Sequence, residues 1–145
     1  MHPFPHQYTI SASVDATDDV VISGEGLPTM VSASPVEFDG PGGRWSPETL
    51  LVAAVLDCFV LTFRAIARVS RVTWITLTCE ATGTLDRVER VSQFTDFAIR
   101  ARLRLPAGGN QEQALRMLSR AEQSCLVTNS LKAPCRLEAS VEIAG

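Results

Sequence analysis

The sequence predicts an α+β protein whose elements follow the order β-β-β-α-β-β-α-β. Apolar and polar residues alternate near the N-terminus and again over 73–105, which indicates strands. A long apolar segment at 46–68 begins with a helix-start signal and indicates a central buried helix. A chain of 145 residues has the size of one domain, so we expect a single domain over 1–145.

The region 1–43 is expected to hold short strands and a loop. In Tyr8–Val14 every second residue is apolar, the period of a half-buried strand. Asp18–Ser23 and Thr29–Ser32 are the next strand candidates. The segment 40–43 reads Gly-Pro-Gly-Gly and indicates a loop before the central helix.

Three consecutive residues mark the start of the helix expected at 46–68. Ser46 can cap an orphan backbone N–H group, Pro47 suits the first helical position, and Glu48 suits the positive end of the helix dipole. Apolar side chains cover most of the circumference between residues 50 and 63. We therefore expect this helix to be central and buried on several sides.

The region 73–105 predicts an antiparallel hairpin with a short polar connection at 87–93. Its arginines at positions 100, 102 and 104 alternate with apolar residues and should face solvent. The region 110–145 predicts an amphipathic helix from an Asn110 cap, then Cys125 just beyond it, a short turn or helix, and a last strand from Cys135.

Composition and charge exclude several classes of protein. The formal net charge is -3 and no long basic tract is present, so we expect no nucleic-acid partner. The N-terminus does not read as a secretory signal. The apolar stretch 50–60 contains Asp57 and is shorter than the roughly 20 residues that span a bilayer, so we expect no membrane association. A cytoplasmic protein is the expectation.

The four cysteines fall into two groups. Cys79 and Cys135 are in phase with the apolar faces of their strands and should be core residues. Cys58 lies on the central helix and Cys125 at the end of the second helix, where a thiol can border a cleft. A structural disulfide would be unusual in the cytoplasm, so spacing alone leaves two readings of this pair: a transient catalytic disulfide, or two buried thiols.

Metal and histidine chemistry are not expected. The sequence has no C-x-x-C motif and no Cys/His ligand spacing. The two histidines, His2 and His6, lie in the N-terminal tail, so a His-assisted Cys or Ser hydrolase is also disfavoured.

Two motifs resemble the organic hydroperoxide resistance and osmotically inducible protein C (Ohr/OsmC) family. The first is residues 45–59, WSPETLLVAAVLDCF, in which a Pro-Glu pair opens a helix and a Cys follows ten residues after the Glu. The second is residues 121–131, AEQSCLVTNSL, in which a Cys follows a helix and precedes an Asn-x-Leu run. The order of elements is also similar to that of the family. The resemblance is closer to its OsmC-like branch.

The resemblance implies a thiol peroxidase that needs no cofactor. Cys58 would attack a hydroperoxide, become a sulfenic acid and condense with Cys125 to a disulfide that an external dithiol, from a lipoyl-bearing protein or a general thiol, reduces. In the family an N-terminal Arg and the helix-start Glu, here Glu48, assist the thiolate. No Arg or Lys precedes Arg44, which makes Arg44 the candidate for that role and for binding substrate.

Helix geometry separates Glu48 from Cys58. Ten helical residues span about 15 Å, so the two side chains cannot meet within one helix. If both serve one site, Glu48 must come from another chain, which two antiparallel central helices in a homodimer would achieve. Family members are likewise intertwined dimers.

Two alternatives remain open at the level of sequence. The first is an OsmC-like protein whose dimer cleft binds an apolar ligand, with Cys58 and Cys125 lining it and no efficient peroxidase activity. The absence of an N-terminal Arg favours this reading, whereas the presence of both cysteines opposes it. The second is a thiol-based redox sensor, for which the sequence shows no effector segment.

Overall fold

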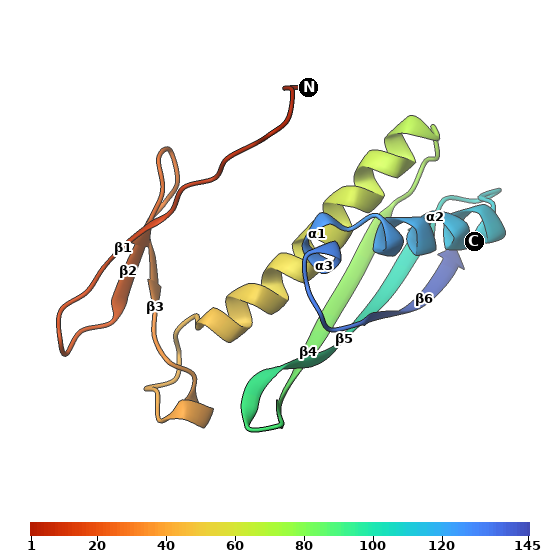
Figure 1. Ribbon diagram of the computed structural model, residues 1–145. Coiled ribbons are helices and arrows are strands. Elements are labelled where there is room, and N and C mark those ends of the chain that lie inside the picture. Colours follow the sequence, from red (N-terminus) through yellow and green to blue (C-terminus); the bar gives the residue numbers. More distant parts are fainter. The chain divides into compact units, whose positions relative to one another are not determined.

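The computed structural model describes all residues from Met1 to Gly145 (Figure 1). The chain forms two compact units, Met1–Leu50 and Leu51–Gly145, and each is described by itself. The long helix α1, Pro47–Val69, begins at the end of the first unit and continues into the second. The α+β class is confirmed, and the expectation of a single domain over 1–145 stays a prediction.

The first unit is built around a small antiparallel sheet in the order β1-β2-β3. Its strands are β1 (Ser11–Ser13), β2 (Val20–Ser23) and β3 (Met30–Ser32). A 3-10 turn, η1 (Val36–Phe38), follows. The sequence predicted three strands here and did not predict η1, which lies in a segment rich in Gly, Pro and Ser.

The first strand is shorter and more exposed than predicted. Only Ser11–Ser13 pair with β2, whereas the alternation had suggested a half-buried strand over Tyr8–Val14. Tyr8 and Ile10 are exposed in the chain, at 88% and 57% of their full accessibility. Little apolar surface of these two side chains is buried within the chain, so burial contributes little to a longer strand.

Helix α1 begins as the sequence predicted. The Ser46 hydroxyl accepts a hydrogen bond from the backbone N–H of Thr49 at 3.1 Å, and the Thr49 hydroxyl accepts one from the backbone N–H of Ser46 at 2.8 Å. This reciprocal pair is a capping box in which Thr replaces the usual Glu or Gln. By length and composition alone α1 could also cross a bilayer, a property that core helices of water-soluble proteins share.

The second unit contains a mixed three-stranded sheet in the order β4-β5-β6. Strands β4 (Thr76–Val88) and β5 (Val91–Leu105) form the predicted antiparallel hairpin, with a bulge between Thr84 and Leu85. The connection predicted at 87–93 is shorter than expected, because the strands pair up to Val88 and Val91. Strand β6 (Cys135–Ile143) pairs with β5 in parallel. That pairing requires a crossover, which helices α2 (Gln111–Gln123) and α3 (Leu126–Asn129) provide.

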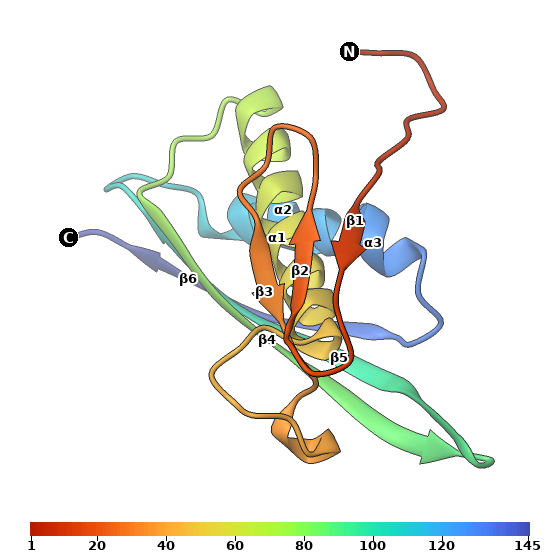
Figure 2. The ribbon, with the colours of Figure 1, turned by 90° about the vertical axis from the view of Figure 1, so that its left-hand side faces the viewer.

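Helices α1 and α2 lie on one face of this sheet (Figures 1 and 2). Asn110 caps α2 as predicted, because its side chain accepts a hydrogen bond from the backbone N–H of Gln113 at 2.9 Å. The core between helices and sheet is formed by alternate residues of β5 and by one stripe of each helix. Within the chain α1 is thus buried on one side, and not on several sides as predicted. Its fully buried large side chains include Phe59, Phe63, Phe97, Ile99, Leu103, Leu105 and Leu118.

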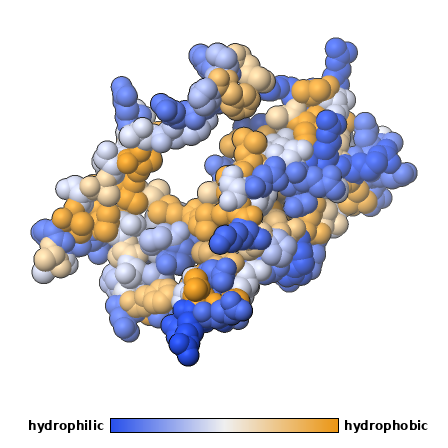
Figure 3. Space-filling model, in the orientation of Figure 1, coloured by the Kyte–Doolittle hydropathy of each residue, from blue (hydrophilic) through white to orange (hydrophobic).

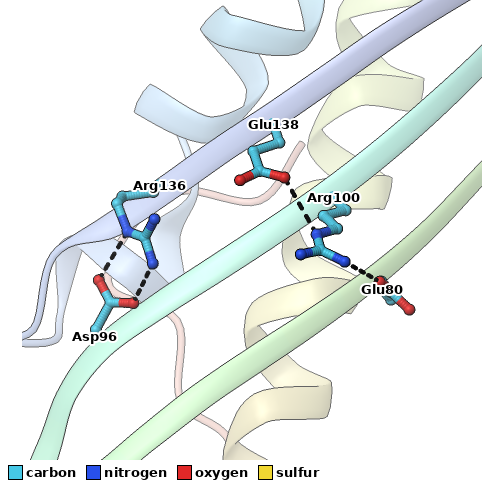
Figure 4. A network of polar contacts seen from close by, with 5 residues as sticks. All are labelled: Glu80, Asp96, Arg100, Arg136 and Glu138. Carbon is cyan, nitrogen blue, oxygen red and sulfur yellow. Dashed lines mark hydrogen bonds and ion pairs between the residues drawn. The ribbon is translucent and has the colours of Figure 1, made fainter.

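The opposite face of the sheet is polar. Arg100 lies in register between Glu80 and Glu138 and binds both carboxylates, at 3.3 and 3.2 Å (Figure 4). Arg136 makes a two-pronged ion pair with Asp96. The predicted solvent exposure of the β5 arginines is confirmed, and the redox candidates must therefore be sought on the helical side.

Candidate functional site

The structure brings Cys58 and Cys125 together on the helical side of the second unit. Cys58 lies on α1 and is half-buried, whereas Cys125 is buried. Each of the two thiols influences the pKa of the other, so their side chains are close in space. Both cysteines are reduced in this structure, so the pair is seen as two adjacent thiols.

The end of α2 and the start of α3 fix the position of Cys125. Its backbone N–H donates to the carbonyl of Glu122 at 3.2 Å, which closes the last turn of α2. Its carbonyl then accepts from the backbone N–H of Asn129 at 3.1 Å and from the Thr128 hydroxyl at 3.2 Å, which opens α3. Cys125 is thus the N-cap residue of α3 and has extended backbone geometry. Hydrogen bonds of its own N–H and carbonyl groups thus fix the backbone of Cys125 between the two helices.

The polar groups near Cys58 favour the ionised form of its thiol. Burial opposes ionisation of this thiol, but its pKa is nevertheless lowered. The groups that lower it are the backbone N–H groups of Val127 and Leu126, the thiol of Cys125 and the hydroxyl of Thr62. Each stabilises the thiolate more than the thiol, and the sum outweighs the desolvation.

Cys125 shifts in the opposite direction. Burial raises the pKa of its thiol, and the hydrogen bond and charge of the neighbouring Cys58 raise it further, although Thr128 acts against this. The two pKa shifts therefore favour ionisation of Cys58 over ionisation of Cys125. In a pair with such pKa shifts, Cys58 can act as the nucleophile and Cys125 can react with the oxidised Cys58 afterwards.

None of the groups that lower the pKa of Cys58 is a charged side chain. Arg44 lies in the first unit, where its Nε donates to Asp19 at 2.8 Å and its Nη1 to the carbonyl of Gly43 at 3.3 Å. Glu48 is in the first turn of α1, and one oxygen of its carboxylate, Oε2, is buried without a hydrogen-bond partner. Within the chain, the Cys58 site therefore consists of neutral donors.

Cys79 and Cys135 lie on the strands and pack against the apolar core, in line with their predicted core role. Burial raises the pKa of Cys79 to about 11. Burial likewise raises the pKa of Cys135 to about 11, helped by the negative charges of Glu122 and Asp96 and by the nearby Cys125 thiol. A raised pKa lowers the thiolate fraction of both residues at neutral pH and thus disfavours their reaction.

Sequence reasoning missed three groups of this site. Thr62 is four residues after Cys58, a spacing that places both side chains on one helix face and could have identified it. The amide groups of Leu126 and Val127 could not be identified, because their orientation depends on the path of the chain after α2. No group of three or more His, Cys, Asp or Glu side chains is placed to hold a metal ion.

These features define a small α+β protein with a thiol pair between a central helix and a short C-terminal helix. The model of the family described as OsmC-like protein matches residues 40–140, and the chain belongs to this family. Uncharacterized protein YmaD of Bacillus subtilis (strain 168) is 27% identical over 116 residues, which cover 77% of either chain. The predicted resemblance is thereby confirmed.

Solved structures of the family show the same fold. An OsmC-like protein of unknown function from Vibrio cholerae aligns with a TM-score of 0.84 at 17% identity, over 94% of this chain and 100% of that one. A protein from Legionella pneumophila described as an organic hydroperoxide resistance protein OsmC aligns with a TM-score of 0.74 at 23% identity, over 97% and 99%. Some members of the family are thus named for hydroperoxide resistance, and others have no assigned function.

Proposed function

We propose that this protein is a thiol peroxidase that reduces organic hydroperoxides through Cys58 and Cys125. One observation carries the proposal: two neighbouring thiols influence each other, and the pKa of Cys58 is lowered while that of Cys125 is raised. In such a pair Cys58 is the more readily ionised thiol and therefore the better candidate for the nucleophile. No metal or organic cofactor is required for the reaction.

The chemistry is a three-step cycle. The Cys58 thiolate attacks the terminal oxygen of a hydroperoxide, the O–O bond breaks, and the alkoxide leaves as an alcohol after taking up a proton. Cys58 is now a sulfenic acid, and the Cys125 sulfur displaces its hydroxyl as water to form a disulfide. An external dithiol then reduces that disulfide by thiol exchange and is itself oxidised. The thiol groups are restored, and two electrons pass from dithiol to peroxide.

Apolar surroundings favour organic over inorganic peroxides. The neighbours of Cys58 along the exposed face of α1 are Ala54 and Leu61, and the next residue of the chain is the buried Phe59. A hydroperoxide with an apolar tail gains burial energy at such a surface, whereas hydrogen peroxide does not. The relatives named for organic hydroperoxide resistance support the same choice.

We further propose that the complete site forms in a homodimer. Only four side chains of the 23-residue α1 are buried in the chain, all on one stripe. Apolar side chains also lie on the surface along α1 (Figure 3), among them Leu61, which is 48% exposed. An apolar face of this kind needs cover, and a second copy packed antiparallel would supply it.

Glu48 gains a role in such a dimer. It is about 15 Å along α1 from Cys58 of its own chain, and its buried Oε2 lacks a hydrogen-bond partner. An antiparallel pair of α1 helices would carry Glu48 of one subunit toward Cys58 of the other. Arg44 of the same subunit would then bind the peroxide oxygens, since its Nη2 forms no hydrogen bond in the chain.

The direct test is consumption of cumene hydroperoxide by the purified protein with dihydrolipoamide as reductant. The wild type should turn over, and Cys58→Ser should lower the rate by on the order of 100-fold or more because the nucleophile is lost. Cys79→Ser is the matched control and should keep the wild-type rate. Full activity of Cys58→Ser would refute the assignment, and an inactive but folded wild type would favour the apolar-ligand-binding alternative.

Mixing two variants of low activity tests the shared site. Glu48→Gln should lower turnover by roughly 10-fold or more through loss of positioning. After subunit exchange with Cys58→Ser, about half of the dimers are mixed and each has one intact site, so activity should return to about a quarter of the wild type. If mixing restores no activity although exchange is shown by mass, the two residues do not share a site across chains.

A further inference from the structure

The outer face of the β4-β5-β6 sheet, which points away from the helices, contains a hollow of about 540 Å³. A volume of this size accommodates a small organic molecule. The hollow and the thiol pair lie on opposite sides of the sheet, so the hollow is separate from the proposed peroxide site. All three strands line it with exposed polar side chains, namely Thr78, Glu80, Arg100, Arg102, Glu138 and Ser140.

These side chains form two neighbouring rows across the sheet, and the first row is acidic. Glu80, Arg100 and Glu138 lie in register from β4 to β6. Arg100 binds both carboxylates, at 3.3 and 3.2 Å (Figure 4). Two carboxylates and one guanidinium leave this row with one formal negative charge. Its polar groups are already engaged with one another.

The second row is the next one along the outer face and consists of Thr78, Arg102 and Ser140, again in register. It places one guanidinium between two hydroxyls and contains no carboxylate. None of the ion pairs of this sheet includes Arg102. A guanidinium has five N–H donors and no acceptor. Within the chain, this row therefore presents a cation and hydrogen-bond donors that lack a negatively charged partner.

The other arginines of the outer face have carboxylates beside them. Arg100 binds two carboxylates, and Arg136 makes a two-pronged pair with one. Arg104 forms no ion pair, but Glu142 lies beside it in register. Arg102 alone combines an unpaired guanidinium with a place in the hollow. A ligand that carries its own carboxylate supplies the acceptor that the chain does not.

We propose that Thr78, Arg102 and Ser140 bind the carboxylate of a small organic monoanion in this hollow. The guanidinium donates two parallel hydrogen bonds to the carboxylate, the geometry that arginine favours. The hydroxyls on either side donate to the same oxygens. The negative charge of the neighbouring row disfavours a dianion such as phosphate. This site does not depend on the proposed peroxidase function.

The test is a titration of the ¹⁵N-labelled protein with benzoate, benzamide and inorganic phosphate, followed by NMR. Benzoate should bind with saturation and shift the Nε signal of Arg102. Benzamide has nearly the same shape without the charge, so it should bind at least about fivefold more weakly. Phosphate should also bind more weakly than benzoate. The absence of saturable benzoate binding, equal binding of benzamide, or tighter binding of phosphate would each overturn the proposal.

Substitutions assign the site to Arg102. Arg102→Gln should weaken benzoate binding by about fivefold or more, because the charge and the paired donors are lost. Arg102→Lys keeps the charge without the planar fork and should give an intermediate loss. Arg104→Gln is the matched control, since it removes the same charge from the same strand outside the hollow, and it should bind within about twofold of the wild type.

Thermal unfolding of each variant verifies that it is folded, and the Arg102→Lys comparison decides if Arg102→Gln is not. Wild-type affinity in a folded Arg102→Gln protein would refute the site. An equal loss in Arg104→Gln would also refute it, because that result indicates a general effect of net charge.

Discussion

Cys58 and Cys79 are both half-buried, yet their thiols respond to the fold in opposite ways. Cys79 lies on a strand among apolar side chains, and burial alone raises its pKa to about 11. Cys58 is also desolvated, on a helix, but the backbone N–H groups of Val127 and Leu126 and nearby side chains lower its pKa. The decisive feature is thus the supply of donors, and not the degree of burial.

The same comparison distinguishes the two remaining cysteines. Cys125 and Cys135 are close enough for the charge of one to affect the other, and both have raised pKa values. Of these two thiols, only Cys125 influences the pKa of Cys58. Position beside Cys58, the proposed nucleophile, and not acidity, therefore makes Cys125 the candidate for the second step.

Among these substitutions, replacement of Cys125 should have the largest effect on turnover. In Cys125→Ser the first attack by Cys58 persists, but no disulfide forms and steady turnover with a dithiol falls by on the order of 100-fold. A sulfenic acid on Cys58 should then be trapped by dimedone and seen by mass. Cys135→Ser is the control and should form the wild-type disulfide. A disulfide between Cys58 and Cys135 in the Cys125→Ser protein would contradict this division of roles.

The pH dependence of alkylation of the four wild-type thiols tests the difference between their pKa values. A thiol reacts as its thiolate, so a lowered pKa moves reactivity to lower pH and a raised pKa moves it to higher pH. Cys58 should be alkylated first as pH rises. Cys79 and Cys135, with pKa values of about 11, should be roughly 100-fold slower at pH 8. Equal rates for Cys58 and Cys79 in the folded protein would contradict the donor account.

Substitution of Gly83 tests how tightly the apolar core packs against β4, the strand that carries Cys79. A Cβ at this position would lie 2.8 Å from Val52 Cγ2, 2.9 Å from Phe94 Cε1 and 3.0 Å from Phe97 Cε1. Gly83→Ala should therefore lower the free energy of unfolding by about 1–3 kcal/mol, measured by urea denaturation. The alkylation profile of Cys58 should not change. A variant as stable as the wild type would show that this contact between α1 and β4 is loose.

The hairpin turn gives the smallest expected effect. Glu89 and Arg90 have φ values of 49° and 70°, a left-handed pair that Asn-Gly adopts with less strain. The double substitution Glu89→Asn/Arg90→Gly should raise the free energy of unfolding by about 0.5–1 kcal/mol without altering any thiol. Thermal unfolding measures the gain, and a loss of stability would show that the turn is not strained.

Much of the fold was predictable because its signals are local. Ser46 and Asn110 cap the helices that the sequence assigned to them, and alternation predicted the hairpin. The parallel pairing of β6 with β5 was not predicted, because register between distant strands is set by tertiary packing. The short β1 was overestimated, since alternation does not say whether anything covers a strand.

The candidate site was predictable in its sulfur atoms and not in its donors. Helix position separated Cys58 and Cys125 from the two strand cysteines. The amides of Leu126 and Val127 belong to the backbone of a turn, and no residue type marks them in the sequence. Thr62 could have been identified from its spacing to Cys58, because side chains four residues apart are neighbours on one face of a helix.

The most direct test of the thiol pair is the mass of the reduced protein before and after one equivalent of cumene hydroperoxide, with the disulfide mapped by peptide digestion. We expect a rapid loss of two hydrogen atoms, localised to Cys58 and Cys125. Cys79 and Cys135 should remain reduced. An unreactive protein, or slow oxidation of all four cysteines without preference, would contradict the account.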